Sequence, residues 1–216
     1  MSIIRPNKYI ANLSPYKITS QDPWIVDDKK DLNKLDWNEG NYIPKIVKKD
    51  IKKYSGLDHI FSWYPDYTAF DLHKALADFH STSVNNVLSF PGSDEALDCV
   101  CRCFLEPYDE VIIPIPSYDN FKVFAESAGA KVIQYEVLKP YEFSLNDFIL
   151  FAEKKNPKII YLVSPNNPCG YIIKPRDVEK ICKAFPRKYQ FLNKKVTFNF
   201  LLSNNRKIKK LNKTFR

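Results

Sequence analysis

One short segment limits what this chain can fold into more than any other: Ser164-Pro165-Asn166-Asn167-Pro168-Cys169-Gly170. It follows an apolar run over residues 158–163, which is typical of a buried strand in a parallel sheet. Its two prolines remove backbone donors and its glycine permits a sharp turn, so the strand stops there. Two asparagine amides are therefore expected at the carboxyl end of a core strand, where open α/β sheets bind ligands. An ordinary turn rich in Asn and Pro is the alternative.

The rest of the chain alternates predicted strands with predicted helices. Strands are predicted over residues 87–90, 110–116, 130–138 and 158–163. Helices are predicted from Ser93, over 119–127 and 145–155, and from Pro175. Asp66 precedes another apolar periodicity and is expected to cap that helix. This order predicts an α/β fold with a mostly parallel sheet and flanking helices.

The turn after the first of these strands predicts an anion site. Gly92 is followed by Ser93, Asp94 and Glu95, which open a helix with a buried apolar face. The free N–H groups and the dipole at a helix start bind anions. Acidic side chains beside a bound anion would be unfavourable, but they can point away from it and cap the helix. A plain capped helix is the alternative interpretation.

The positive charge of the chain is confined to its last thirty residues. The net charge is +8, from 33 basic and 25 acidic residues. Ten of the basic residues and none of the acidic ones lie in residues 187–216. The preceding 186 residues therefore carry 23 basic and 25 acidic residues, so the overall charge does not predict nucleic-acid binding.

Composition also bears on the cellular compartment, on membrane spans and on metal binding. No apolar run approaches the roughly 18 residues of a membrane span. The odd count of five cysteines, without a disulfide framework, favours a reducing cytoplasm. His73 and His80 lie seven apart on one predicted helix with no carboxylate or cysteine at ligand spacing, so no metal site is expected.

Together these pieces give the chain a family resemblance. The segments that carry it are Asp36-Trp37-Asn38-Glu39, Trp63-Tyr64-Pro65-Asp66, Gly92-Ser93-Asp94-Glu95-Ala96, Pro116-Ser117-Tyr118 and the turn at 164–170. Their order and spacing resemble the class I/II, fold-type-I aminotransferases that use pyridoxal 5′-phosphate, most of all the histidinol-phosphate aminotransferase branch. The resemblance runs from Leu35 to Cys182, about two-thirds of the chain.

The resemblance implies a role for each site residue. Backbone N–H groups of Ser93, Asp94 and Glu95 would bind the cofactor phosphate, and Tyr118 would stack on its ring. Asn167 would donate its amide to the phenolic oxygen of the cofactor. The resemblance also implies a homodimer, in which Tyr64 reaches the phosphate of the neighbouring subunit. Asn38 and Glu39 would help to enclose the amino-acid and keto-acid substrates.

Two groups that the resemblance requires are missing after residue 182. A lysine should hold the cofactor as a Schiff base, and an aspartate should contact the ring nitrogen. Residues 171–216 contain no glycine, so Lys213 does not lie in the expected Ser-Lys, glycine and arginine motif. We therefore expect a truncated or frameshifted, non-catalytic fragment. A basic tail that binds nucleic acid is the alternative for residues 187–216.

The sequence thus predicts three regions. Residues 1–50 are expected to form an N-terminal arm and substrate-side segment, 51–186 an incomplete cofactor-binding large domain, and 187–216 a non-homologous basic tail. The intact relative would transfer an amino group from an amino acid to a keto acid or phosphorylated ketone in the cytoplasm. A decarboxylase of the same fold and a non-enzymatic basic binding protein are the alternatives. No nucleic-acid or membrane partner is expected.

Overall fold

The structure, a computed structural model, describes residues 7–13, 42–57, 62–139, 141–155 and 157–184. Asn38, Glu39 and the region 187–216 lie outside these described residues, so the expectations about them stay predictions. The described residues from 90 onward form one compact unit with residues 7–13, and those from 42 to 89 form another.

The unit of residues 42–89 is built from short helices. It contains α2 (Lys45–Tyr54), α4 (Phe70–His80) and the 3-10 turn η2 (Val84–Asn86). The carboxylate of Asp66 accepts hydrogen bonds from the backbone N–H groups of Thr68, at 2.9 Å, and of Phe70, at 3.3 Å. The N-cap position of α4 is Ala69, without a side-chain cap, so Asp66 is not the N-cap that its position before the apolar periodicity predicted. Asp66 nevertheless contacts the first turn of α4 through the N–H of Phe70.

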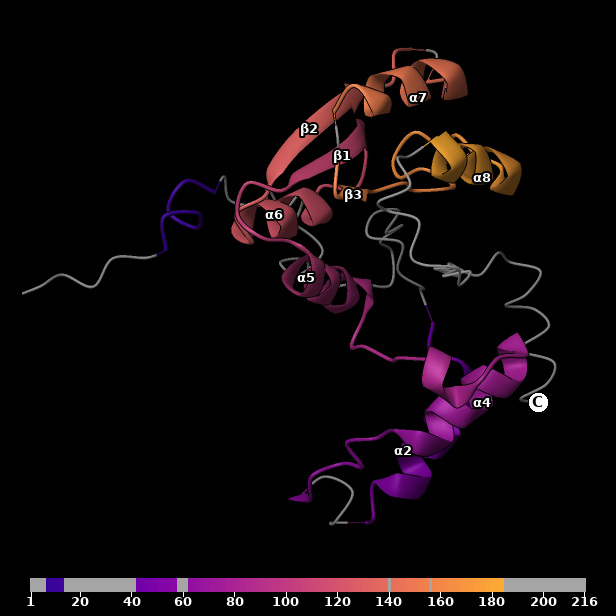
Figure 1. Cartoon of the computed structure of the whole chain (residues 1–216). Coiled ribbons are helices and arrows are strands. Elements are labelled where there is room, and N and C mark those ends of the chain that lie inside the picture. Colours follow the sequence, from indigo (N-terminus) through magenta and orange to yellow (C-terminus); the bar gives the residue numbers. More distant parts are fainter. Residues whose placement is uncertain (1–6, 14–41, 58–61, 140, 156, 185–216) are drawn as a thin grey trace, which may run out of the picture. The chain divides into compact units, whose positions relative to one another are not determined.

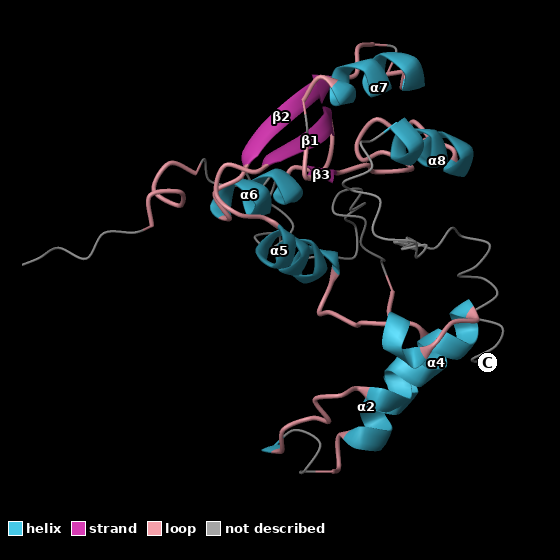
Figure 2. Cartoon of the chain, in the orientation of Figure 1, coloured by secondary structure: helices cyan, strands magenta, loops and turns pink. Residues whose placement is uncertain are grey.

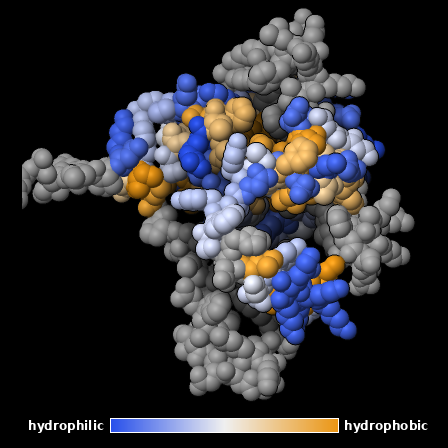
Figure 3. Space-filling model, turned by 90° about the horizontal axis from the view of Figure 1, so that it is seen from below, coloured by the Kyte–Doolittle hydropathy of each residue, from blue (hydrophilic) through white to orange (hydrophobic). Residues whose placement is uncertain are grey.

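The strand predicted at residues 87–90 does not form. This segment has no regular secondary structure, and the side chain of Leu88 is 77% exposed. A strand needs a partner for its backbone and a buried face for its side chains. Among the described residues no strand pairs with this segment, and Phe90 is exposed like Leu88. Apolar side chains are exposed elsewhere too, and Figure 3 shows them in orange among the hydrophilic residues on one face.

A parallel sheet forms the centre of the other unit. Its described strands are β1 (Glu110–Ile115), β2 (Lys131–Glu136) and β3 (Ile159–Ile160), in the order β2-β1-β3. Both pairings are parallel, and Ile112 of β1 lies opposite Ile133 of β2 and Ile160 of β3. The predicted strands at 110–116 and 130–138 are therefore confirmed, whereas the one at 158–163 shortens to two residues.

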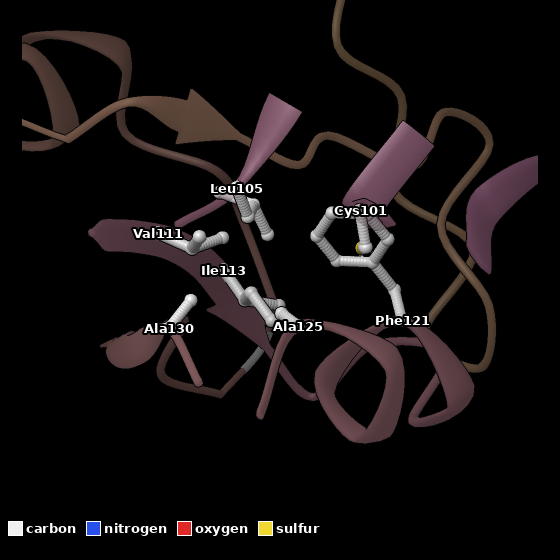
Figure 4. Close-up of a cluster of buried hydrophobic side chains, with 7 residues drawn as sticks. All are labelled: Cys101, Leu105, Val111, Ile113, Phe121, Ala125 and Ala130. Atoms are coloured by element: carbon white, nitrogen blue, oxygen red, sulfur yellow. The ribbon is translucent and has the colours of Figure 1, made fainter. Parts of the chain in front are cut away.

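Helices cover both faces of this sheet. Val111 and Ile113 point to one face, where they pack with residues of α5 (Ser93–Phe104) and α6 (Asn120–Ser127). Figure 4 shows this cluster: Cys101, Leu105, Val111, Ile113, Phe121, Ala125 and Ala130. Ile112 points to the opposite face, which α7 (Leu145–Glu153) and α8 (Pro175–Ala184) cover (Figure 1). The predicted fold class, a mostly parallel sheet with flanking helices, is confirmed.

An ion pair joins the amino ends of β1 and β3. Nζ of Lys158 lies 2.8 Å from Oδ2 of Asp109, and the backbone N–H of Lys158 donates to the carbonyl of Glu110. Partial burial acts to raise the pKa of the Asp109 carboxyl. Hydrogen bonds from Lys158 and from the N–H of Glu106, together with the lysine charge, outweigh that effect and lower the pKa below its usual value.

This lowered pKa predicts a loss of stability in acid. A carboxyl whose pKa is lower in the folded state stabilises the protein above its unfolded pKa of about 4, and the effect is lost as the pH falls through the folded value. Because the pair is partly exposed, we expect about 0.2–1 kcal/mol. Asp109→Asn should remove this part of the acid sensitivity, measured by urea unfolding between pH 6 and pH 3. Glu153→Gln, an exposed charge on α7, is the control; equal changes in both variants would count against the ion pair.

The described residues contain neither a membrane-spanning helix nor a cluster of metal-ligating side chains. Within them, no helix is both long and apolar enough to cross a bilayer. No group of three or more His, Cys, Asp or Glu side chains in the same residues is arranged to hold a metal ion.

Candidate functional site

Three segments of the larger unit meet at one edge of the sheet. Because β1 and β3 are parallel, the loops that follow them leave from the same edge. The amide of Asn166, in the loop after β3, donates to the carbonyl of Pro116, in the loop after β1, at 3.2 Å. The hydroxyl of Tyr118, which also lies in the loop after β1, donates to the carboxylate of Asp94 in the first turn of α5. Side-chain hydrogen bonds therefore connect both loops to a helix start.

Asn166 holds the turn after β3 together. Its side chain is only 5% exposed, and it is the buried polar residue of the described core. Besides Pro116, its amide nitrogen reaches the hydroxyl of Tyr171 at 3.1 Å, and its amide oxygen accepts the N–H of Cys169 at 2.9 Å. A buried amide with its donor and acceptor both satisfied fixes the path of the backbone around it.

A second set of bonds closes the same loop. The hydroxyl of Ser164 accepts the N–H of Ile173 at 2.9 Å and donates to its carbonyl at 3.0 Å. The backbone N–H of Asn166 also donates to the carbonyl of Tyr171 at 2.8 Å. The loop is thus anchored on both sides, and Asn167 is exposed between these anchors. The two asparagines that look alike in the sequence differ in environment: the first is buried and the second faces solvent.

The start of α5 has no side-chain cap. The helix begins at Ser93, as predicted, and no side chain caps it at Gly92. Gly92 has a φ of +101° and a ψ of 166°, a conformation that residues with a side chain rarely adopt. A Cβ built on Gly92 would meet nothing within 4 Å. Open space therefore lies beside Gly92, directly before the first N–H groups of the helix, which have no intrahelical partner.

The acidic residues of that first turn do not cap it. The carboxylate oxygens of Asp94 lie 2.8 and 3.1 Å from the hydroxyl oxygen of Tyr118. Oδ2 of Asp94 also accepts from the amide of Asn120 at 2.7 Å. Glu95 is exposed and lies 3.5 Å from Arg102. Asp94 therefore directs its charge toward Tyr118 and Asn120.

Aromatic packing lies beside these polar contacts. The rings of Phe121 and Tyr161 are stacked, with their centroids 4.0 Å apart and their planes 13° apart. Burial, with a further contribution from the charge of Asp94, raises the pKa of Tyr161 to about 12. Burial raises the pKa of Tyr171 to about 12 as well. Both phenols are therefore neutral at physiological pH.

The structure places the predicted site residues in two groups. Ser93, Asp94, Glu95, Tyr118 and Asn167 all belong to the larger unit, at or next to the three connected segments. Tyr64 belongs to the other unit, and its side chain is fully exposed. The roles predicted for these residues stay predictions.

Sequence reasoning missed two residues. Asn120 has no motif of its own, and its contact with Asp94 spans 26 positions of the chain. Asn166 was expected only as a second displayed amide, but it is buried and holds the turn. Its position beside two prolines was the available signal, since such a turn needs a side chain to satisfy its backbone.

This arrangement suits a flat, phosphorylated ligand. The start of α5 offers backbone donors for an anion, Tyr118 offers an aromatic ring, and Asn167 offers an exposed amide. None of these groups is a base or nucleophile by itself. The site as described can bind and orient a ligand.

Comparison with known proteins identifies the family. The family model described as aminotransferase class I and II matches residues 32–192. This chain belongs to that family. The match includes the start of α5, both loops and residues 38 and 39.

The relatives of this chain are longer than it is. A histidinol-phosphate aminotransferase of Ruminiclostridium cellulolyticum is 30% identical over 179 residues, which are 82% of this chain and 46% of the relative. A dihydroxyacetone phosphate transaminase of Campylobacter jejuni is 31% identical over 181 residues, 82% of this chain and 48% of the relative. The chain therefore spans just under half of the length of these relatives.

Solved structures show the same fold. The histidinol-phosphate aminotransferase of Sinorhizobium meliloti, in complex with pyridoxal 5′-phosphate, matches 67% of this chain and 38% of its own, with a TM-score of 0.59 and 24% identity. Cystalysin of Treponema denticola, which contains the same cofactor, matches 73% of this chain and 46% of its own, with a TM-score of 0.56 and 23% identity. At these identities the likeness shows the fold alone, and it agrees with the fold-type-I domain predicted from the sequence.

Proposed function

We propose that this chain binds pyridoxal 5′-phosphate and supplies the cofactor-binding part of a histidinol-phosphate-type aminotransferase. The observation that carries the proposal is the connection of the α5 start, the Tyr118 loop and the Asn166 turn by side-chain hydrogen bonds. The uncapped helix start and the open side of Gly92 fit a phosphate monoester. Family membership and the complexes of the solved relatives support the choice of cofactor.

Each residue has a proposed role in holding the cofactor. The backbone N–H groups of Ser93, Asp94 and Glu95 bind the phosphate, and the ring of Tyr118 stacks on the pyridine ring. The amide of Asn167 donates to the phenolic oxygen. When bound, pyridoxal phosphate supplies an electron sink for amino-group chemistry. No residue of this sequence is assigned the role of the Schiff-base lysine.

We also propose the substrates, a homodimer and the compartment of this protein. The substrates would be an amino acid and a keto acid or phosphorylated ketone, with Asn38 and Glu39 on the substrate side. A homodimer would bring Tyr64 to the phosphate of the neighbouring subunit. The five cysteines are free thiols, which supports a reducing cytoplasm. The relatives of 30% identity or more named above are transaminases, which favours transamination over the decarboxylase alternative.

Pyridoxamine 5′-phosphate is the probe that tests cofactor binding. It carries an amine in place of the aldehyde, so it forms no imine with lysines and reports the non-covalent site alone. Equilibrium dialysis with the full chain should show saturable binding. Pyridoxamine without phosphate should bind at least about tenfold more weakly, because hydrogen bonds to a charged group contribute about 1.5–3 kcal/mol. Equal affinity for both compounds, or no binding of either, would contradict the proposal.

Substitution of Gly92 tests the phosphate position directly. Gly92→Ala places a side chain at a φ of +101°, which costs about 1–3 kcal/mol and shifts the turn before α5. We expect roughly tenfold weaker binding of pyridoxamine 5′-phosphate, measured by calorimetry, together with a lower Tm. Gly56→Ala is the matched control, because it has open space and no such φ. If Gly92→Ala binds as tightly as Gly56→Ala, the phosphate does not lie at the start of α5.

A further inference from the structure

Three polar side chains form a closed set of hydrogen bonds at the edge of the sheet. They are Asp94 in the first turn of α5, Tyr118 in the loop after β1, and Asn120 at the first position of α6. The hydroxyl of Tyr118 lies 2.8 and 3.1 Å from the two carboxylate oxygens of Asp94. The amide nitrogen of Asn120 lies 2.7 Å from the carboxylate and 2.8 Å from the hydroxyl. Each of the three therefore contacts the other two.

This geometry determines where the ring of Tyr118 lies. The hydroxyl uses its proton toward Asp94 and accepts from Asn120, so both of its hydrogen-bonding functions are engaged. A hydrogen bond to a carboxylate is roughly twice as strong as one between neutral groups. The backbone holds one end of the side chain and these bonds hold the other, so little rotation about its two torsions is left.

The partners of Tyr118 are themselves held by regular structure. Asp94 lies on α5, and Asn120 precedes Phe121, which is 1% exposed and stacked on Tyr161. All three polar side chains are half-buried. Groups held on rigid helices place a contact more accurately than groups on loops do.

We propose that Asp94 and Asn120 are positioning residues that hold the ring of Tyr118 as a wall for a flat, phosphorylated ligand. This inference rests on the proposed function, because the ligand is its cofactor. The same contacts explain how an acidic residue, Asp94, can lie at a helix start that is proposed to bind a phosphate. The carboxylate of Asp94 accepts hydrogen bonds from two side chains, so its charge faces Tyr118 and Asn120 while its backbone N–H stays in the first turn of α5.

A double-mutant cycle separates action through Tyr118 from direct action on the ligand. Asp94→Ala should weaken the binding of pyridoxamine 5′-phosphate by the full chain about tenfold. Tyr118→Phe should weaken it to a similar extent, because it removes the hydroxyl through which Asp94 and Asn120 hold the ring. In the Tyr118→Phe background, Asp94→Ala should add less than about twofold, since the hydroxyl it acts on is already absent. Asp94→Asn keeps one acceptor oxygen and should recover part of the loss.

Asp98→Ala is the matched control. It removes the same charge one turn further along α5, where Asp98 pairs with Arg102 at 3.0 Å. Its binding of pyridoxamine 5′-phosphate should equal that of the unmodified chain. Effects of Asp94→Ala and Tyr118→Phe that add fully would overturn the positioning role, because Asp94 would then act independently of the hydroxyl. No binding by the unmodified chain would instead contradict the proposed function.

A spectrum of the chain without ligand tests the contact itself. In protein labelled with 3-fluorotyrosine, the ¹⁹F resonance of Tyr118 is the one lost in Tyr118→Phe. We expect Asp94→Ala and Asn120→Ala to shift this resonance, and Asp98→Ala to leave it in place. An unshifted resonance in both variants would overturn the inference even if the ligand binds.

Discussion

Replacing Asn166 by alanine is expected to lower the free energy of unfolding by about 2–4 kcal/mol, because buried polar groups left without partners cost about 1–3 kcal/mol each. The substitution removes the donor to the carbonyl of Pro116 and to the hydroxyl of Tyr171. It also removes the acceptor of the N–H of Cys169. The loops after β1 and β3 lose their direct connection, so binding of pyridoxamine 5′-phosphate should fall as well.

Asn167→Ala makes the matched comparison, since it changes the same residue type one position along the chain. Asn167 is exposed, so the substitution should change the unfolding free energy by less than about 0.5 kcal/mol. It should weaken binding of pyridoxamine 5′-phosphate about threefold to tenfold, the value of one hydrogen bond. Urea unfolding and calorimetry on both variants measure the two effects. Equal losses of stability would contradict the division of roles between the two amides.

Local signals in the sequence predicted much of the fold. The start of α5 at Ser93 and of α8 at Pro175 follow from the residues at those positions. The apolar run that becomes β1 has all of its central positions buried, so its pattern alone identified a core strand. These features depend on neighbours within a few residues, which a single sequence contains.

Features that depend on distant partners were not predictable. Residues 87–90 have the apolar pattern of a strand, yet Leu88 and Phe90 are exposed and no strand forms there. The pattern cannot show whether a partner lies beside a segment. In the same way, the contact between Asp94 and Asn120 joins positions 26 apart, so nothing near either residue indicated it.

For the candidate site too, the sequence predicted local features and missed those that depend on tertiary contacts. The motifs gave Ser93, Tyr118 and Asn167 as candidate ligand contacts, and the structure places them in one unit. The motifs did not predict that Asn166 is buried, because its burial depends on how the turn packs on the loop after β1. Local chemistry thus predicts which residues can meet a ligand, and tertiary contacts decide which of them support the others.

Replacing Phe121 by alanine is expected to cost the most stability of the substitutions considered, about 3–5 kcal/mol, because large-to-small changes in a core lose burial and leave a cavity. Its ring is 1% exposed and stacks on Tyr161 at 4.0 Å between centroids. It belongs to the cluster that packs α5 and α6 on β1 (Figure 4). The free energy of unfolding of a small domain is only about 5–15 kcal/mol, so this substitution should remove a large part of it.

The same substitution should also reach the candidate site, because Asn120 precedes Phe121 at the start of α6. If loss of Phe121 loosens α6, the ¹⁹F resonance of Tyr118 should shift at temperatures below the unfolding transition. Phe104→Ala is the matched control: this side chain is 48% exposed on α5, so its loss should cost less than about 1 kcal/mol. Urea unfolding followed by circular dichroism measures both variants. Equal unfolding midpoints for Phe121→Ala and Phe104→Ala would show that the packing of α6 on β1 does not stabilise this unit.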